Sequence, residues 1–129
     1  MRMKTFSRYT LILVTMIVSL PSVLAHHSFA MFDSSTELTL EGRVTEFQWT
    51  NPHSWLQVEI INADGEAEDW AIEMLSPSVL GRMGWKRNSL ARGDEVRVVI
   101  HPLHSGAFGG NMVRVINTGT GEEIGGPGR

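Results

Sequence analysis

The segment from Glu37 to Trp49, ELTLEGRVTEFQW, decides the fold. Apolar residues alternate with polar ones from Leu38 onward, and the alternation changes parity before Phe47. A change of parity within one strand predicts a bulge or bend, and Gly42 would give the backbone the freedom to make it. A long first strand that bends in this way favours a small closed barrel, because closure requires such bends.

Four further stretches have the pattern of strands, through either apolar-polar alternation or a run of β-branched residues. They are residues 54–61, 69–74, 95–100 and 112–116. Before the fourth strand, Ser76 and Pro77 predict the start of a short helix over 77–83, and Gly84 predicts its end. This order predicts an all-β, five-stranded OB-like barrel with one short helix between strands 3 and 4; a small open sandwich is the alternative.

Residues 1–25 have the organisation of a cleavable signal peptide. Three basic residues among the first eight precede an uncharged apolar run, YTLILVTMIVSL, over residues 9–20. This run is shorter than the roughly 20 apolar residues of a membrane-spanning helix. We therefore expect cleavage before His26 rather than a retained anchor, and a periplasmic or secreted protein with no stable membrane span after processing.

Cleavage would leave one domain, over residues 26–118, and a Gly-rich tail over 119–129 that we expect to be flexible. It would remove three of the eleven basic residues and none of the fourteen acidic ones, which leaves a net charge of −6. An acidic surface repels phosphate backbones, so we expect no nucleic acid partner. The chain has no cysteine, which excludes disulfides, thiolate metal sites and cysteine nucleophiles.

All five histidines follow the predicted signal peptide: His26, His27, His53, His101 and His104. Cleavage would make His26 the first residue, whose amine and imidazole could chelate one metal ion, and another histidine could complete a three-nitrogen copper site. His27 offers a second chelate through the amine, its own amide and its imidazole. We therefore expect copper as a possible cofactor, held by His26 or His27 with His53, His101 or His104. The alternative is structural: a polar N-terminal stretch, two solvated loop histidines and a histidine that fastens its own turn.

A second possible site lies in the turn between the first two strands. Trp49, Asn51 and Trp55 could form an aromatic ligand face that binds a peptide, a saccharide or an envelope protein. Packing of the tryptophans in the core is the alternative. Glu59 and Glu73 are expected to be solvated strand residues, and no motif indicates catalysis, so an enzyme is the least favoured interpretation.

Four short motifs resemble a family of small exported bacterial proteins whose domain has no known function. They are HHSFAMFD at 26–33, GRV at 42–44, NPHS at 51–54 and GDEV at 93–96. The resemblance extends from His26 to about Val115. It implies a secreted or periplasmic β-rich domain and no established activity, and the shared pattern includes His26, His27 and the Asn51-Pro52-His53 turn.

Overall fold

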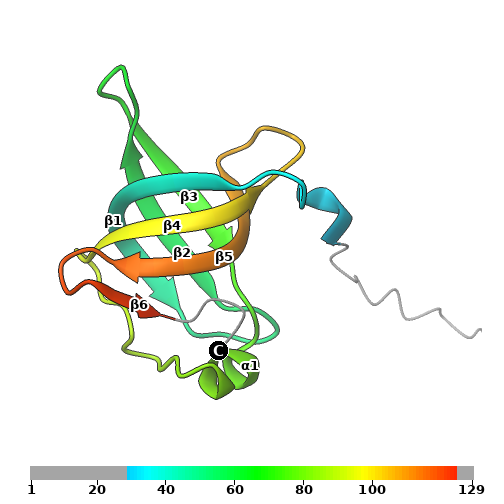
Figure 1. The fold of residues 1–129 in the computed structure, drawn as a ribbon, viewed down its shortest axis with the longest axis vertical. Helices are drawn as coiled ribbons and strands as arrows, with labels where there is room; N and C mark the ends of the chain where they lie inside the picture. Colours follow the sequence, from blue (N-terminus) through cyan, green and yellow to red (C-terminus); the bar gives the residue numbers. More distant parts are fainter. Residues whose placement is uncertain (1–28, 125–129) are drawn as a thin grey trace, which may run out of the picture.

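The alternating and β-branched segments form strands in the computed structural model, which describes residues 29–124 (Figure 1). A 3₁₀ turn η1 (Phe29–Met31) comes first, and helix α1 (Pro77–Arg82) lies between β3 and β4. The strands are β1 (Leu38–Gln48), β2 (Trp55–Ile61), β3 (Ala67–Glu73), β4 (Glu95–Pro102), β5 (Gly109–Asn117) and β6 (Glu122–Ile124). The predicted signal peptide, His26 and His27 lie outside the described residues.

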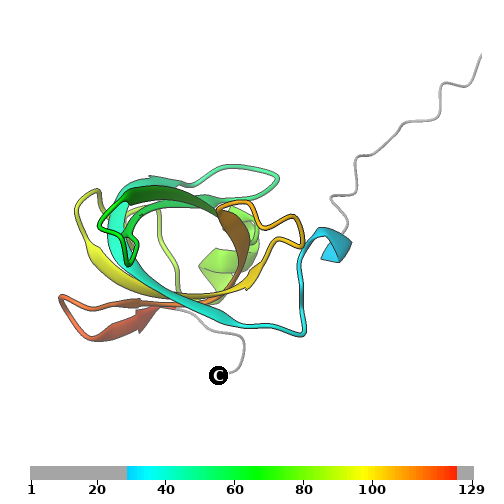
Figure 2. The same cartoon turned by 90° about the horizontal axis from the view of Figure 1, so that it is seen from above.

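The strands close into a barrel. They follow the order β3-β2-β1-β4-β5-β6, and a parallel pairing of β3 with β5 joins the two sides of the sheet. Figure 2 looks into the resulting ring of strands. β6 adds to β5 alone and takes no part in the closure. The predicted five-stranded OB-like barrel with one short helix is therefore confirmed, rather than the open sandwich.

The bend in β1 lies where the change of parity predicts it, and Gly42 has a different role from the expected one. The register of β1 against β2 shifts between Val44 and Glu46, which is the bulge. Gly42 lies two residues earlier, where the two strands come very close. A Cβ atom at Gly42 would lie 2.2 Å from the carbonyl oxygen of Glu59 and 2.6 Å from Cδ1 of Ile60. The absent side chain thus permits close packing of β1 on β2, as glycine does where backbones approach.

The apolar face of each strand points into the barrel and forms the core. Leu56, Ile72 and Ile100 are completely buried there. Helix α1 contributes the completely buried Leu80, so the helix is part of the core packing at one end of the barrel. Ser76 caps this helix by accepting a hydrogen bond from the backbone N–H of Val79, as the sequence predicts.

The C-terminal part of the described chain is more ordered than expected. Residues 122–124, which we assigned to a flexible tail, form β6 and pair with residues 115–117 of β5, and Ile124 is buried. Apolar-polar alternation cannot identify a strand of only three residues. Residues 125–129 lie outside the described part.

β5 also begins earlier than predicted. It starts at Gly109, three residues before the predicted start of the last strand at residue 112. Gly109 serves the closure of the barrel, because a Cβ atom there would lie 3.0 Å from the carbonyl oxygen of Ala71 on β3, and Gly110 permits close packing on β4, where its Cβ atom would lie 2.6 Å from the carbonyl oxygen of His101. Within residues 29–124, no helix has the length and apolar character needed to cross a membrane.

Candidate functional site

The pairing of β3 with β5 places a row of four side chains on the outer face of the barrel. Trp55 lies opposite Glu73, Glu73 lies beside Asn111, and Asn111 lies opposite His101. Directly paired residues share one face of a sheet. The residues that follow or precede them along the strands are in the buried core, so this row points outward.

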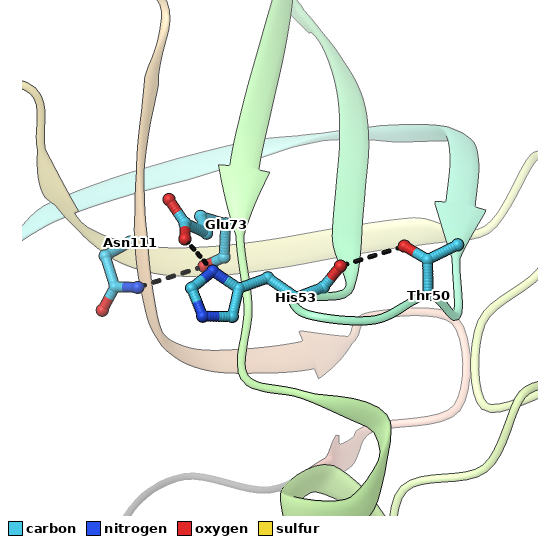
Figure 3. Close-up of polar contacts among 4 residues, drawn as sticks. All are labelled: Thr50, His53, Glu73 and Asn111. Atoms are coloured by element: carbon cyan, nitrogen blue, oxygen red, sulfur yellow. Dashed lines mark hydrogen bonds and ion pairs between the residues drawn. The ribbon is translucent and has the colours of Figure 1, made fainter. Parts of the chain in front are cut away.

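Glu73 is buried although it belongs to the outward row. Only 5% of its side chain is exposed, so the expectation of a solvated strand glutamate is wrong. Its carboxylate pairs with Nδ1 of His53, and Nδ2 of Asn111 donates a 3.3 Å hydrogen bond to its backbone oxygen (Figure 3). A buried carboxylate needs a partner such as His53, because an unpaired one is costly to remove from water. Glu73 and His53 therefore form one polar unit at the closure.

The turn that carries His53 is held on both sides. Thr50 donates its hydroxyl to the backbone oxygen of His53, at 2.9 Å. The next residue, Ser54, donates its backbone N–H to Leu75, at 3.1 Å, which extends the β2–β3 pairing beyond β2. The Asn51–Pro52 peptide bond within the turn is cis. The two hydrogen bonds, from Thr50 to His53 and from Ser54 to Leu75, fix the backbone from which the imidazole of His53 reaches Glu73.

The contact between His53 and Glu73 uses Nδ1 of the imidazole. An ionised carboxylate only accepts hydrogen bonds, so Nδ1 donates when Glu73 is in that form. The side chain of His53 is 30% exposed. In metal sites a ligating histidine commonly donates its other N–H to a carboxylate, which orients the ring and raises its basicity. The pair of His53 and Glu73 has the same composition as such a histidine and its carboxylate.

The other two described histidines lie elsewhere. Nδ1 of His101 donates a 2.9 Å hydrogen bond to the backbone oxygen of Thr36, just before β1. β1 flanks β4 on the side opposite β5, so His101 leans away from Asn111 and Glu73. His104 is exposed in the loop after β4. Residues 29–124 contain no group of three or more histidine or acidic side chains that could hold a metal ion by itself.

The segment before β1, residues 31–36, is fastened to the end of β4, and we call it the anchor segment. Phe32 is buried and pairs with Leu103, and the backbone N–H of Asp33 donates to Pro102 at 2.8 Å. The backbone N–H of His104 donates to Met31 at 3.0 Å. With the bond from His101 to Thr36, these contacts attach both ends of the anchor segment to residues 101–104.

The Asp33 carboxylate stabilises the turn in the anchor segment. Hydrogen bonds from the side chains of Ser35 and Thr36 and from the backbone of Ser35 lower the pKa of Asp33 below its usual 3.8, with a smaller effect of His104. A lowered pKa means that the folded protein favours the ionised form. The stabilisation is therefore present above about pH 4 and is lost as the pH falls through the lowered pKa.

We expect Asp33→Asn to reduce the loss of stability that the protein shows on acidification. Urea unfolding midpoints measured near pH 5 and pH 2.5 should lie closer together in Asp33→Asn than in the unchanged protein. Asp64→Asn, at the tip of the β2–β3 hairpin, removes the same charge and serves as the control. An equal acid-induced shift in Asp33→Asn and the unchanged protein would contradict this role.

The predicted aromatic face is only partly formed. Trp49 packs edge-on against Phe47, with ring centroids 6.0 Å apart, and contacts the core. Trp55 instead lies in the outward row, half-buried. The structure thus does not bring the two tryptophans onto one face; Trp55 and the exposed Asn51 remain at the surface near His53.

Comparison with known proteins gives a family and a distant structural likeness. The model of a family of unknown function, DUF6152, matches residues 14–112. A crystal structure of the mitochondrial single-stranded DNA binding protein Rim1 of S. cerevisiae aligns with a TM-score of 0.48 and 11% identity over 70% of this chain and 95% of that chain. None of the curated proteins matches the sequence.

Proposed function

The chain belongs to the family DUF6152, whose function is unknown, and we propose from the site itself that the protein is exported and binds a copper ion. In this proposal His53 supplies one nitrogen ligand from the barrel. The N-terminal residue exposed by signal cleavage, His26, supplies an amine and an imidazole, or His27 does so through its own chelate. The protein would work in the periplasm or outside the cell.

The contact between His53 and the buried Glu73 carries the proposal. It orients the imidazole through Nδ1, and the side chain of His53 is 30% exposed, which suits a ring that contributes a ligand at the surface of the barrel. A histidine that fastens its own turn often donates to a backbone carbonyl, whereas His53 contacts a buried carboxylate. The cost of burying Glu73 is offset by a pairing that suits a metal ligand.

The choice of copper rests on the available ligands. The chain has five histidines and no cysteine, so nitrogen donors predominate and thiolates are absent. Imidazole and amine nitrogens suit Cu(II), and affinity for such donors rises toward copper along the divalent series. Since His53 is one ligand and residues 29–124 supply no complete group, the remaining ligands are proposed to come from the N-terminal histidines.

The test is a Cu(II) titration of the mature chain that begins at His26. We expect binding of one ion, and at least tenfold weaker binding by a His26→Ala, His27→Ala double variant, because the ligands beyond His53 are lost. Equal affinity of the two proteins would contradict the proposal. Intact mass of protein isolated from the periplasm checks that the chain does begin at His26.

A second variant separates the amine from the imidazoles. A mature chain with Gly-Ser placed before His26 keeps every histidine and moves the free amine away. If His26 chelates through its amine, this chain should bind Cu(II) more weakly than the unchanged protein and should show an altered electron paramagnetic resonance spectrum. Identical spectra would exclude the amine as a ligand.

A further inference from the structure

The basic residues of the described chain are concentrated in one stretch. Residues 29–124 carry seven basic and fourteen acidic side chains, and four of the seven basic ones lie within residues 74–93, which contain no acidic residue. We call residues 74–93 the basic segment; its cations are Arg82, Lys86, Arg87 and Arg92. The rest of residues 29–124 has three basic and fourteen acidic residues. A net charge of +4 is thus separated from a net charge of −11.

The four cations of the basic segment are exposed, and none of them forms an ion pair within residues 29–124. On the barrel wall, by contrast, Arg43 pairs with Glu95 at 3.1 Å and Arg97 pairs with Glu41 at 2.6 Å. The first acidic residue after the segment, Asp94, accepts a backbone hydrogen bond instead of pairing with an arginine. A chain with twice as many acidic as basic residues therefore leaves four like charges together, although like charges repel one another.

The large apolar side chains of the basic segment hold it against the barrel. Leu80, Trp85 and Leu90 are at most 4% exposed. Backbone hydrogen bonds from Trp85 to Leu80, at 3.0 Å, and from Ser89 to Lys86, at 2.9 Å, fix the turns between them. The exposed large apolar side chains of residues 29–124 all lie outside the segment. The surface of the segment therefore presents positive charge in fixed positions without an apolar anchor.

Charge is separated along the long axis of the molecule. Helix α1 and the connection to β4 lie at one end, and the tip of the β2–β3 hairpin lies at the other (Figure 1). The hairpin, residues 55–73, has six acidic residues and no basic one. β2, with seven residues, spans about 20 Å, which is more than twice the Debye length of about 8 Å at physiological salt. The acidic tip is therefore screened from a surface that contacts the basic segment.

We propose that the basic segment is a docking surface for the anionic headgroups of a phospholipid bilayer, with the β2–β3 hairpin pointing away from the bilayer. A bilayer presents dispersed negative charge and requires no shape complementarity, which suits exposed cations without an apolar anchor. A protein partner would favour a buried aromatic or apolar centre, which the surface of the segment lacks. A nucleic acid strand would be repelled by the acidic barrel and would find no exposed aromatic side chain in the segment to stack on.

Co-sedimentation with lipid vesicles tests the proposal. The protein is used without residues 1–25, because an apolar leader would itself bind lipid. We expect binding to vesicles of equal parts phosphatidylglycerol and phosphatidylcholine, and none to vesicles of phosphatidylcholine alone. Raising NaCl from about 0.1 M to about 1 M shortens the Debye length from about 10 Å to about 3 Å and should release the protein.

Removal of two cations from the basic segment should weaken this binding strongly. Each cation close to an anionic surface contributes about fivefold, so Lys86→Gln combined with Arg87→Gln should weaken vesicle binding about 25-fold. Arg97→Gln combined with Arg114→Gln is the matched control, because it removes the same charge from β4 and β5. The control should bind within about twofold of the unchanged protein, because its side chains lie outside the docking surface.

Circular dichroism melting first shows that each double variant is folded. Selective loss of vesicle binding in the variant of the basic segment supports the proposal. Absence of binding to the anionic vesicles, an equal loss in both double variants, or binding that persists at high salt would overturn it. A segment that binds a DNA oligonucleotide or a second copy of the chain, and not the vesicles, would also overturn it. Copper binding enters none of these outcomes, so the proposed function is tested separately.

Discussion

Replacing Glu73 with glutamine is expected to weaken Cu(II) binding by the mature protein about 10- to 100-fold, although residue 73 is not proposed as a ligand. The carboxylate orients His53 through Nδ1, and a carboxylate that accepts the Nδ1 proton raises the basicity of the ring. A glutamine amide is a weaker acceptor, and its NH₂ group can donate to Nδ1, which would place the proton on Nε2 and block the metal. Competitive titration measures the loss.

The matched control is Glu59→Gln. Glu59 lies on β2, is half-buried and pairs in register with Arg43, away from His53. Its replacement should leave Cu(II) affinity within about twofold of the unchanged protein. His53→Ala should weaken binding at least as much as Glu73→Gln, because it removes the ligand itself. Full affinity in Glu73→Gln would show that the pair is structural only.

Gly42→Ala is expected to lower the free energy of unfolding by about 3 kcal/mol, at the upper end of the usual cost of overpacking. The added Cβ atom would meet the Glu59 carbonyl oxygen at 2.2 Å and Ile60 Cδ1 at 2.6 Å. The side chain of Ile60 could move, but the backbone oxygen of Glu59 belongs to the β2 ladder. β1 and β2 would therefore have to separate next to the bulge.

Gly81→Ala provides the comparison for this effect. Gly81 lies in α1, and a Cβ atom there would have no heavy atom within 4 Å. The helix should tolerate alanine and gain about 0.5–1 kcal/mol, because alanine loses less backbone entropy on folding than glycine. Urea unfolding of the two variants measures both effects. An unchanged midpoint in Gly42→Ala would contradict the close packing of β1 on β2.

The sequence was sufficient to predict the barrel because its signals are local. Apolar-polar alternation predicts β2, the change of parity in that alternation predicts the bulge in β1, and Ser76-Pro77 predicts the start of α1. The closing pair escaped prediction because it joins segments far apart in the chain. Gly109 and Gly110 have the composition of a loop, and only their pairing with β3 and β4 explains why they are strand residues.

For the same reason, the sequence predicted one member of the candidate site, His53, and not the other, Glu73. His53 attracts attention through its residue type and its place after Asn51-Pro52. Glu73 does not, because alternation tells which face of a strand a residue occupies and not whether another part of the chain covers that face. Its contacts with His53 and Asn111 join it to residues that are 20 and 38 positions away in sequence.

The parallel pairing of β3 with β5 also sets when the site can come into existence. Contacts between residues so distant in sequence form only after long loops have closed, and such topologies fold slowly. In the proposed export, the chain would pass through a secretion channel as an extended polypeptide and would have no preorganised coordination sphere there. The protein would thus acquire the metal ion only after it has folded completely. An ion that binds only the native state would in turn stabilise that state against unfolding.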